Sequence, residues 1–254
     1  MSTAESTASP LARDGAISVR LCRAKYELRG RLSCHPAAYL PLARRKYAGN
    51  VGKVVEHDRT QVVIDGFQRS ANTFSVTAFQ FAQPEPVNVA HHLHAAAQIA
   101  AAVRWRIPTM VLIREPDGAI ISHMIRFPCV TPEQAIRNWS RFYEAVRAVR
   151  DGVVVADFEE VTGDFGVSIR RLNERFGTAF TPFDHTEGNV QRCFELIDRR
   201  NAGRFGTVED HTVARPSAAR ERKKDTARSA FMDPRLEGRR ARVRALYDDL
   251  VTGG

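Results

Sequence analysis

A polar loop that could hold an anion follows a short apolar run at residues 62–67. The run is rich in β-branched residues, which is typical of a buried strand. From Asn72 onward apolar residues recur near helical spacing, so the loop leads into the start of a helix. Free backbone N–H groups and the positive end of the helix dipole then face the loop. Arg69 adds a fixed positive charge, and Ser70, Asn72 and Thr73 add side-chain donors.

The same loop has a plainer interpretation, which is a capped helix start with an exposed arginine. It is not the phosphate-binding loop of nucleotide triphosphatases, because that motif needs Gly and then Lys before the Ser or Thr. Here those two positions hold Ala71 and Asn72.

Polar side chains also follow two further apolar runs. His91 and His92 follow residues 87–90, and Arg114 follows residues 109–113. Ligands of parallel sheets bind at the carboxyl ends of the strands. We therefore expect these side chains and the first loop to share one crevice.

The elements that must position them alternate along the chain. Strands are predicted at 62–67, 87–90, 109–113 and 153–156, and helices at 37–47, from 72, and at 95–105, 117–125, 132–149 and 161–176. This alternation predicts an α/β fold with a parallel sheet flanked by helices on both faces, a three-layer α/β/α arrangement. Residues 1–17 are small and polar and predict a flexible leader, followed by a single domain over 18–254.

The composition is that of an ordinary globular protein with an excess of positive charge. The chain has 254 residues, a net charge of +9 and 43% hydrophobic residues. Between residues 199 and 244, 14 Lys and Arg stand against six Asp and Glu. Such an excess indicates an anionic partner, although a solvated helical face would also account for it.

The four cysteines and the apolar runs indicate the cellular compartment of the protein. Cys22, Cys34, Cys129 and Cys193 form no C-x-x-C pair, which predicts free thiols and a reducing compartment. The N-terminus lacks the apolar core of a signal peptide, and no apolar run nears the roughly 18 residues that cross a bilayer. A cytoplasmic protein is predicted.

The segment from Phe67 to Phe74 resembles the 5′-phosphosulfate-binding loop of sulfotransferases that use 3′-phosphoadenosine 5′-phosphosulfate (PAPS). In that family an aromatic residue precedes Pro-Lys-Ser-Gly-Thr-Thr, and a large apolar residue follows. Gln68 replaces the proline, Arg69 the lysine and Asn72 a threonine. Arginine keeps the charge but cannot serve as a mobile proton donor. The resemblance implies a P-loop-nucleotide-hydrolase-like fold and cofactor contacts at residues 69–74, namely Arg69, Ser70, Ala71, Asn72, Thr73 and Phe74.

The segment from Leu112 to Ser122 is similar to the family's 3′-phosphate motif. That motif has an arginine at a strand end and a serine eight residues later on the following helix. The resemblance makes Arg114 and Ser122 the ligands of the phosphate that separates PAPS from common adenine nucleotides. Arg126, one turn further on, is either an extra contact or a surface residue.

A base is needed to take the proton of the sulfuryl acceptor, and histidine is the usual choice near neutral pH. The family carries its base in a Lys-Thr-His-Leu-Pro segment, and alignment on the His-Leu pair gives His92 that role. His94, in the place of the proline, is the second candidate. Either histidine could instead cap a helix or pair with an acidic neighbour. A metal site is less favoured, since no acidic or Cys ligand lies close in sequence.

The basic segment at about 204–244 resembles the loop that covers the cofactor in many sulfotransferases. The run of residues 215–224 makes Arg220 the first candidate for the 3′-phosphate and Arg215 the second. Acceptor pockets in the family are built by variable loops, here expected at 127–139 and 180–201.

These features predict a sulfotransferase that moves a sulfuryl group from PAPS to a hydroxyl or amine of a small molecule or carbohydrate, without a metal. Arg69 would neutralise charge on the leaving nucleotide, and His92 would deprotonate the acceptor. Three alternatives stay open: a nucleotide-dependent kinase, a nucleic-acid-binding protein that uses the basic segment, and a PAPS-binding protein that has lost catalysis. Sparse aromatic residues in the basic segment argue against nucleic acid.

Overall fold

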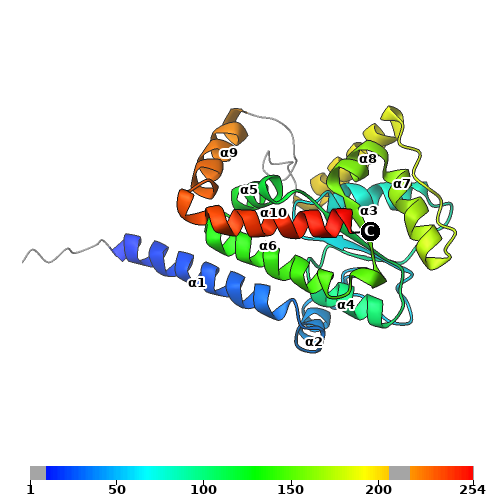
Figure 1. Ribbon diagram of the computed structural model, residues 1–254, viewed down its shortest axis with the longest axis horizontal. Helices are drawn as coiled ribbons and strands as arrows, with labels where there is room; N and C mark the ends of the chain where they lie inside the picture. Colours follow the sequence, from blue (N-terminus) through cyan, green and yellow to red (C-terminus); the bar gives the residue numbers. More distant parts are fainter. Residues whose placement is uncertain (1–9, 206–217, 254) are drawn as a thin grey trace, which may run out of the picture.

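The computed structural model describes residues 10–205 and 218–253, with side chains from 17 to 203 and from 224 to 253 (Figure 1). At its centre lies a four-stranded sheet in the order β2-β1-β3-β4, in which every neighbouring pair is parallel. The strands are β1 Val62–Gly66, β2 Val89–His91, β3 Thr109–Ile113 and β4 Val154–Asp157. The predicted α/β class and the four predicted strands are confirmed.

Helices fill most of the rest of the described chain. They are α1 Pro10–Leu32, α2 Pro36–Lys46, α3 Asn72–Ala82, α4 Ala96–Arg104, α5 Pro116–Arg126, α6 Pro132–Arg147, α7 Phe158–Phe176, α8 Glu187–Phe205, α9 Ala218–Phe231 and α10 Glu237–Thr252, with short 3₁₀ turns at Arg150–Gly152 and Pro234–Leu236. The six helices predicted from the sequence are all present, with ends that differ by a few residues.

The two faces of the sheet are covered by different helices, because neighbouring strand residues point to opposite sides. Ile64 and Leu112 belong to an apolar cluster with residues of α3, α7 and α8. Val111 and Ile113 belong to a second cluster with residues of α4, α5, α6 and α10. Both clusters are buried, so the sheet is the middle layer of three, as predicted. All three strands that lead to the site therefore end inside a rigid core.

The first helix begins inside residues 1–17, where the sequence predicts a flexible leader. Helix α1 begins at Pro10 and runs along α6, while its N-terminal end projects from the body (Figure 1). Proline fits the first position of a helix because its missing N–H needs no partner there. Once a helix is nucleated, each added residue costs little. Residues 1–9 lie outside the described part of the chain.

A disulfide bond joins Cys22 of α1 to Cys129 in the connection between α5 and α6. The prediction of free thiols is wrong for these two residues, while Cys34 and Cys193 are free. The pair is 107 residues apart and is brought together by tertiary packing, so no local spacing could indicate it. Disulfides are rare in reducing compartments, so the cysteines no longer support a cytoplasmic location. In the described part of the chain, no helix is long and apolar enough to cross a membrane.

Candidate active site

The loop after β1 is held in an unusual backbone conformation. Arg69 and Ala71 both have positive φ, 74° and 61°, although neither is glycine. Gly66 lies so close to β3 that a Cβ there would stand 2.1 Å from the carbonyl oxygen of Leu112. The left-handed Ala71 followed by the helical Asn72 curls successive backbone N–H groups toward one point. Such a curl forms an anion-binding concavity.

The start of α3 leaves these N–H groups open. Its N-cap is Ala71, and no described side chain caps the first turn. The Asn72 side chain instead bonds within the loop: its Nδ2 donates to the carbonyl oxygen of Phe67 at 2.9 Å. The Ser70 hydroxyl is buried and meets no partner at hydrogen-bond geometry among the described residues, although the phenol of Tyr143 lies beside it. The loop therefore fits an anion through its backbone and through Ser70.

Replacing Ala71 with glycine is expected to stabilise the protein by about 0.5–1 kcal/mol. A left-handed conformation costs alanine about 1–2 kcal/mol, and the extra chain entropy of glycine offsets about half of that gain. The free energy of unfolding, measured in urea, checks the prediction. Ala241→Gly on the exposed face of α10 is the matched control and should lose about 1 kcal/mol. Loss of stability at both positions would contradict the strain at Ala71.

The second predicted motif meets the first loop directly. Nε of Arg69 donates to Oγ of Ser122 on α5 at 2.9 Å, and a guanidinium nitrogen of Arg114 lies 3.5 Å from the carbonyl oxygen of Arg69. The Arg114 guanidinium also stacks 4.3 Å from the ring centre of Phe158. Gly118 makes room for it, since a Cβ there would stand 3.0 Å from Arg114. Two guanidinium groups and a hydroxyl thus converge beyond the ends of β1 and β3.

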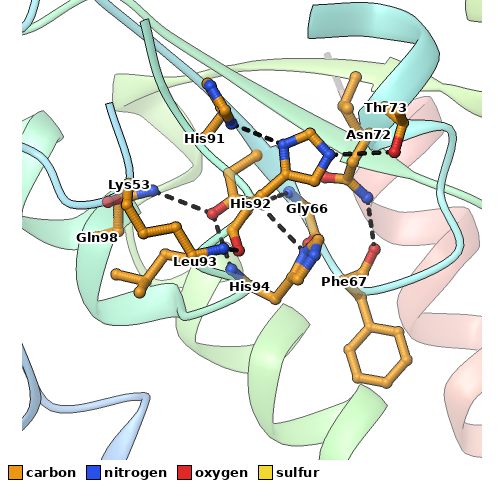
Figure 2. A network of polar contacts seen from close by, with 12 residues as sticks. Lys53, Gly66, Phe67, Asn72, Thr73, His91, His92, Leu93, His94 and Gln98 are labelled. Atoms are coloured by element: carbon orange, nitrogen blue, oxygen red, sulfur yellow. Dashed lines mark hydrogen bonds and ion pairs between the residues drawn. The ribbon is translucent and has the colours of Figure 1, made fainter. Parts of the chain in front are cut away.

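Three histidines lie at the end of β2, near Asn72 and Thr73 of the first loop (Figure 2). Nε2 of His92 is 3.1 Å from Oγ1 of Thr73, and Nδ1 of His92 is 2.7 Å from Nδ1 of His91. Nζ of Lys53 donates to the carbonyl oxygen of His92. His92 and His94 both have positive φ, 57° and 51°. Left-handed residues other than glycine cluster at functional sites, and four of the five in the described part of the chain lie in these two loops.

The buried carboxylate of Asp65 accepts hydrogen bonds from His94, the last of these histidines. Asp65 of β1 has no exposed surface, and it accepts hydrogen bonds from the backbone N–H of Gly66 and of His94 and from Nε2 of Gln98. Nδ1 of His94 lies 3.3 Å from the same carboxylate. Burial alone would raise the pKa of Asp65, but the hydrogen bonds from the ring and the backbone N–H of His94 hold it below the usual value. Asp65 therefore stays charged at neutral pH.

The first two histidines are neutral at physiological pH. Burial lowers the pKa of His92 to about 3, with the neighbouring His94 and His91 acting in the same direction. Burial also lowers the pKa of His91 to about 4, against the opposing charge of Asp65. Both rings can therefore accept a proton or a hydrogen bond without first losing one.

A small pocket opens next to the loop, beneath α1. Its walls carry Tyr26 and Arg29 of α1, Ser33 directly after α1, Gln68 of the loop, His94 and His123. Of the regions expected to form the acceptor pocket, 127–139 contributes Asn138, and 180–201 contributes no residue. The sequence interpretation missed Tyr26, Arg29 and Ser33. Their spacing of three and then four residues was the available signal, because it puts them on one helical face.

The remaining predicted residues divide into three groups. The Phe74 side chain lies in the apolar core against Phe165 and Phe183, so it offers the site only its backbone. Arg126 is exposed above the ring of Phe127. Arg215 and the side chain of Arg220 lie outside the described residues. Helices α9 and α10 nevertheless pack on α5, the helix that carries Ser122 (Figure 1).

Comparison with known proteins identifies no family for this chain. The chain matches no protein-family model, and no curated protein matches it. Among solved structures, a match is the crystal structure of a mouse sulfotransferase complexed with PAP, with 12% identity and a TM-score of 0.39 over 82% of this chain and 94% of that chain. A TM-score this low carries no argument about function. The function is therefore argued from this chain's own residues.

Proposed function

We propose that the protein is a sulfotransferase that uses PAPS to sulfate a hydroxyl or amine. The observation that carries the proposal is the meeting of two motifs that are 45 residues apart in the chain, through the contact of Arg114 with Arg69 and the bond from Arg69 to Ser122. An anion cradle alone would fit many phosphorylated ligands. A second anchor beside it, made by the Arg114 guanidinium and the Ser122 hydroxyl, fits a ligand with two anionic groups.

The chain's own residues then divide the work of binding. Backbone N–H groups of residues 70–73 and the Ser70 hydroxyl hold the 5′-phosphosulfate, because they already point at one place and need no rearrangement. Arg114 and Ser122 hold the 3′-phosphate. Arg69 lies between the two groups and can neutralise the charge that develops on the leaving nucleotide. PAPS itself supplies an activated sulfuryl group.

A base must take the proton of the acceptor, and the neutral histidines at the end of β2 supply one. The resemblance to sulfotransferases assigns this role to His92, whose Nε2 contacts Thr73 of the loop. The arrangement relies on positioning and charge stabilisation, as phosphoryl transfer does. In the described part of the chain no group of three or more His, Cys, Asp or Glu residues could hold a metal ion.

Thermal shift with three nucleotides tests the cofactor class without an acceptor. We expect 3′,5′-adenosine bisphosphate (PAP) to raise Tm clearly more than ADP or ATP with Mg²⁺ at equal concentration, since ligands that bind the native state stabilise it in proportion to RT ln(1 + [L]/Kd). At 100 times Kd the gain is about 2.7 kcal/mol. A larger shift with ATP and Mg²⁺ would favour the kinase instead.

The same thermal-shift experiment also tests the nucleic-acid alternative. A shift with generic RNA or DNA that disappears at high salt, together with no shift with PAP, would contradict the proposal, because phosphate-backbone binding is strongly salt-dependent. A shift with PAP but no turnover with any acceptor would indicate a protein that binds PAPS and has lost catalysis.

A further inference from the structure

We propose that His94 is the base of the reaction, that Asp65 orients it, and that the acceptor hydroxyl reaches it through the pocket beneath α1. This inference rests on the proposed sulfuryl transfer. It moves the base two residues along the chain from the position that the family resemblance gives.

The bonds around His94 fix where its ring carries a proton. Nδ1 lies 2.8 Å from the carbonyl oxygen of Gly66 and 3.3 Å from a carboxylate oxygen of Asp65. Both partners can only accept, so the proton must sit on Nδ1. The lone pair of the neutral ring is then on Nε2, at the opposite edge. Figure 2 shows the ring held against Gly66 in this way.

Nε2 of His94 is the ring nitrogen that these bonds leave open. The side chain is 18% exposed and lines the pocket beneath α1, and Nε2 has no hydrogen-bond partner among the described residues. A carboxylate behind Nδ1–H and an open Nε2 in front is the arrangement that orients a general base and stabilises the imidazolium that forms.

His92 is less suited to the same task. Both of its ring nitrogens already face a partner, Nε2 the Thr73 hydroxyl and Nδ1 the ring of His91. Burial lowers the pKa of His92 to about 3, and so weak a base gains little from proton transfer near neutral pH. Its contact with Thr73 instead holds the anion loop against β2. His92 is therefore a positioning residue in this inference.

The pocket, with a free volume of about 20 Å³, has room for the reacting hydroxyl group but not for a whole acceptor molecule. It is bounded by Gln68 of the anion loop, so a hydroxyl in it lies next to the phosphosulfate. His123 on the same pocket is buried, and its Nδ1 has no hydrogen-bond partner among the described residues, while its Nε2 binds the Tyr26 hydroxyl at 2.8 Å. A buried polar atom without a partner normally has an absent ligand or water to satisfy it.

In the transfer step with these groups, every bond, proton and electron pair is accounted for. The acceptor O–H bond breaks and its proton moves to Nε2 of His94, while the oxygen electron pair forms the new S–O bond. The S–O bond to the nucleotide breaks, and PAP leaves with that electron pair. The Nε2 proton of His94 then passes to water, which restores the starting state without any oxidant, reductant or metal.

His94→Asn tests the assignment with little change in structure. The asparagine amide can still donate to the carbonyl oxygen of Gly66 as Nδ1 does, but nothing replaces Nε2. With PAPS and a panel of 2-naphthol, 1-hexanol and glucosamine, we expect kcat to fall by roughly 10²–10⁴-fold. The Kd of PAP should stay within about twofold. The loss should be largest for the least acidic hydroxyl, which depends most on a base and which a merely structural defect would not single out.

Two further variants complete the comparison. His92→Gln should lose clearly less kcat than His94→Asn, and His57→Asn, at a ring that is 60% exposed on the surface, should match the parent. Parent-like turnover by His94→Asn, or a greater loss with His92→Gln, overturns the assignment. ¹⁵N NMR of the neutral ring needs no acceptor: a tautomer with its proton on Nε2 of His94 instead of Nδ1 would also overturn it. Failure of the parent to bind PAP would instead overturn the proposed function.

Discussion

Replacing Arg114 with alanine is expected to weaken PAP binding by about 100-fold, which corresponds to about 2.7 kcal/mol. Charge-assisted bonds to a partly buried phosphate are the strong ones, and Arg114 is held in place by the ring of Phe158 and the carbonyl oxygen of Arg69. The affinity for 5′-AMP, which lacks the 3′-phosphate, should change little. Isothermal titration with both nucleotides measures the difference.

Two further variants separate charge from geometry at this position. Arg114→Lys keeps the charge but loses the flat, two-pronged contact, so we expect an intermediate loss. Arg126→Ala, at the end of α5 and exposed above Phe127, should bind PAP as the parent does. An equal loss of PAP and 5′-AMP affinity in Arg114→Ala would remove Arg114 from the 3′-phosphate role, because the residue would then be acting on a shared part of both ligands.

The sheet and its loops could be read from the sequence because the signals there are local. Four apolar runs and the helical spacing between them follow directly from the burial of a parallel sheet on both faces, and buried Ile64 and Val111 lie where those runs predict. The polar loop at residues 68–73 and Arg114 could be found for the same reason, since each directly follows a strand. Parallel topology then brings them to one edge.

What the sequence did not reveal depends on contacts between distant parts of the chain. The Cys22–Cys129 bond and the α1 wall of the pocket both come from the packing of α1 on α6. Neither leaves a local pattern strong enough to be recognised. The direction of Arg69, toward Ser122, is a rotamer choice set by the neighbouring helix. In the sequence, Asp65 is one polar residue in an apolar run. Its role is seen only in the structure, where four donors surround its carboxylate.

Replacing Asp65 with asparagine is expected to lower the free energy of unfolding by about 3 kcal/mol. Every partner of the carboxylate is a donor: two backbone N–H groups, Nε2 of Gln98 and Nδ1 of His94. An amide presents its own NH₂ to at least one of these donors, which leaves buried groups unsatisfied with no access to water. Urea unfolding measures the loss. Asp58→Asn, at a carboxylate that is 90% exposed, is the control and should stay within about 0.5 kcal/mol of the parent.

The same residue predicts how stability depends on pH. The pKa of Asp65 in the folded protein is lower than in the unfolded chain, where it is about 3.9. Its contribution is therefore fully present above the unfolded value and is lost as pH falls through the folded value. The parent should lose stability steeply below about pH 4, and Asp65→Asn should lose clearly less over the same range. If the free energy of unfolding falls equally with acid in parent and variant, the Asp65 carboxylate is not the group that His94 and its neighbours hold charged.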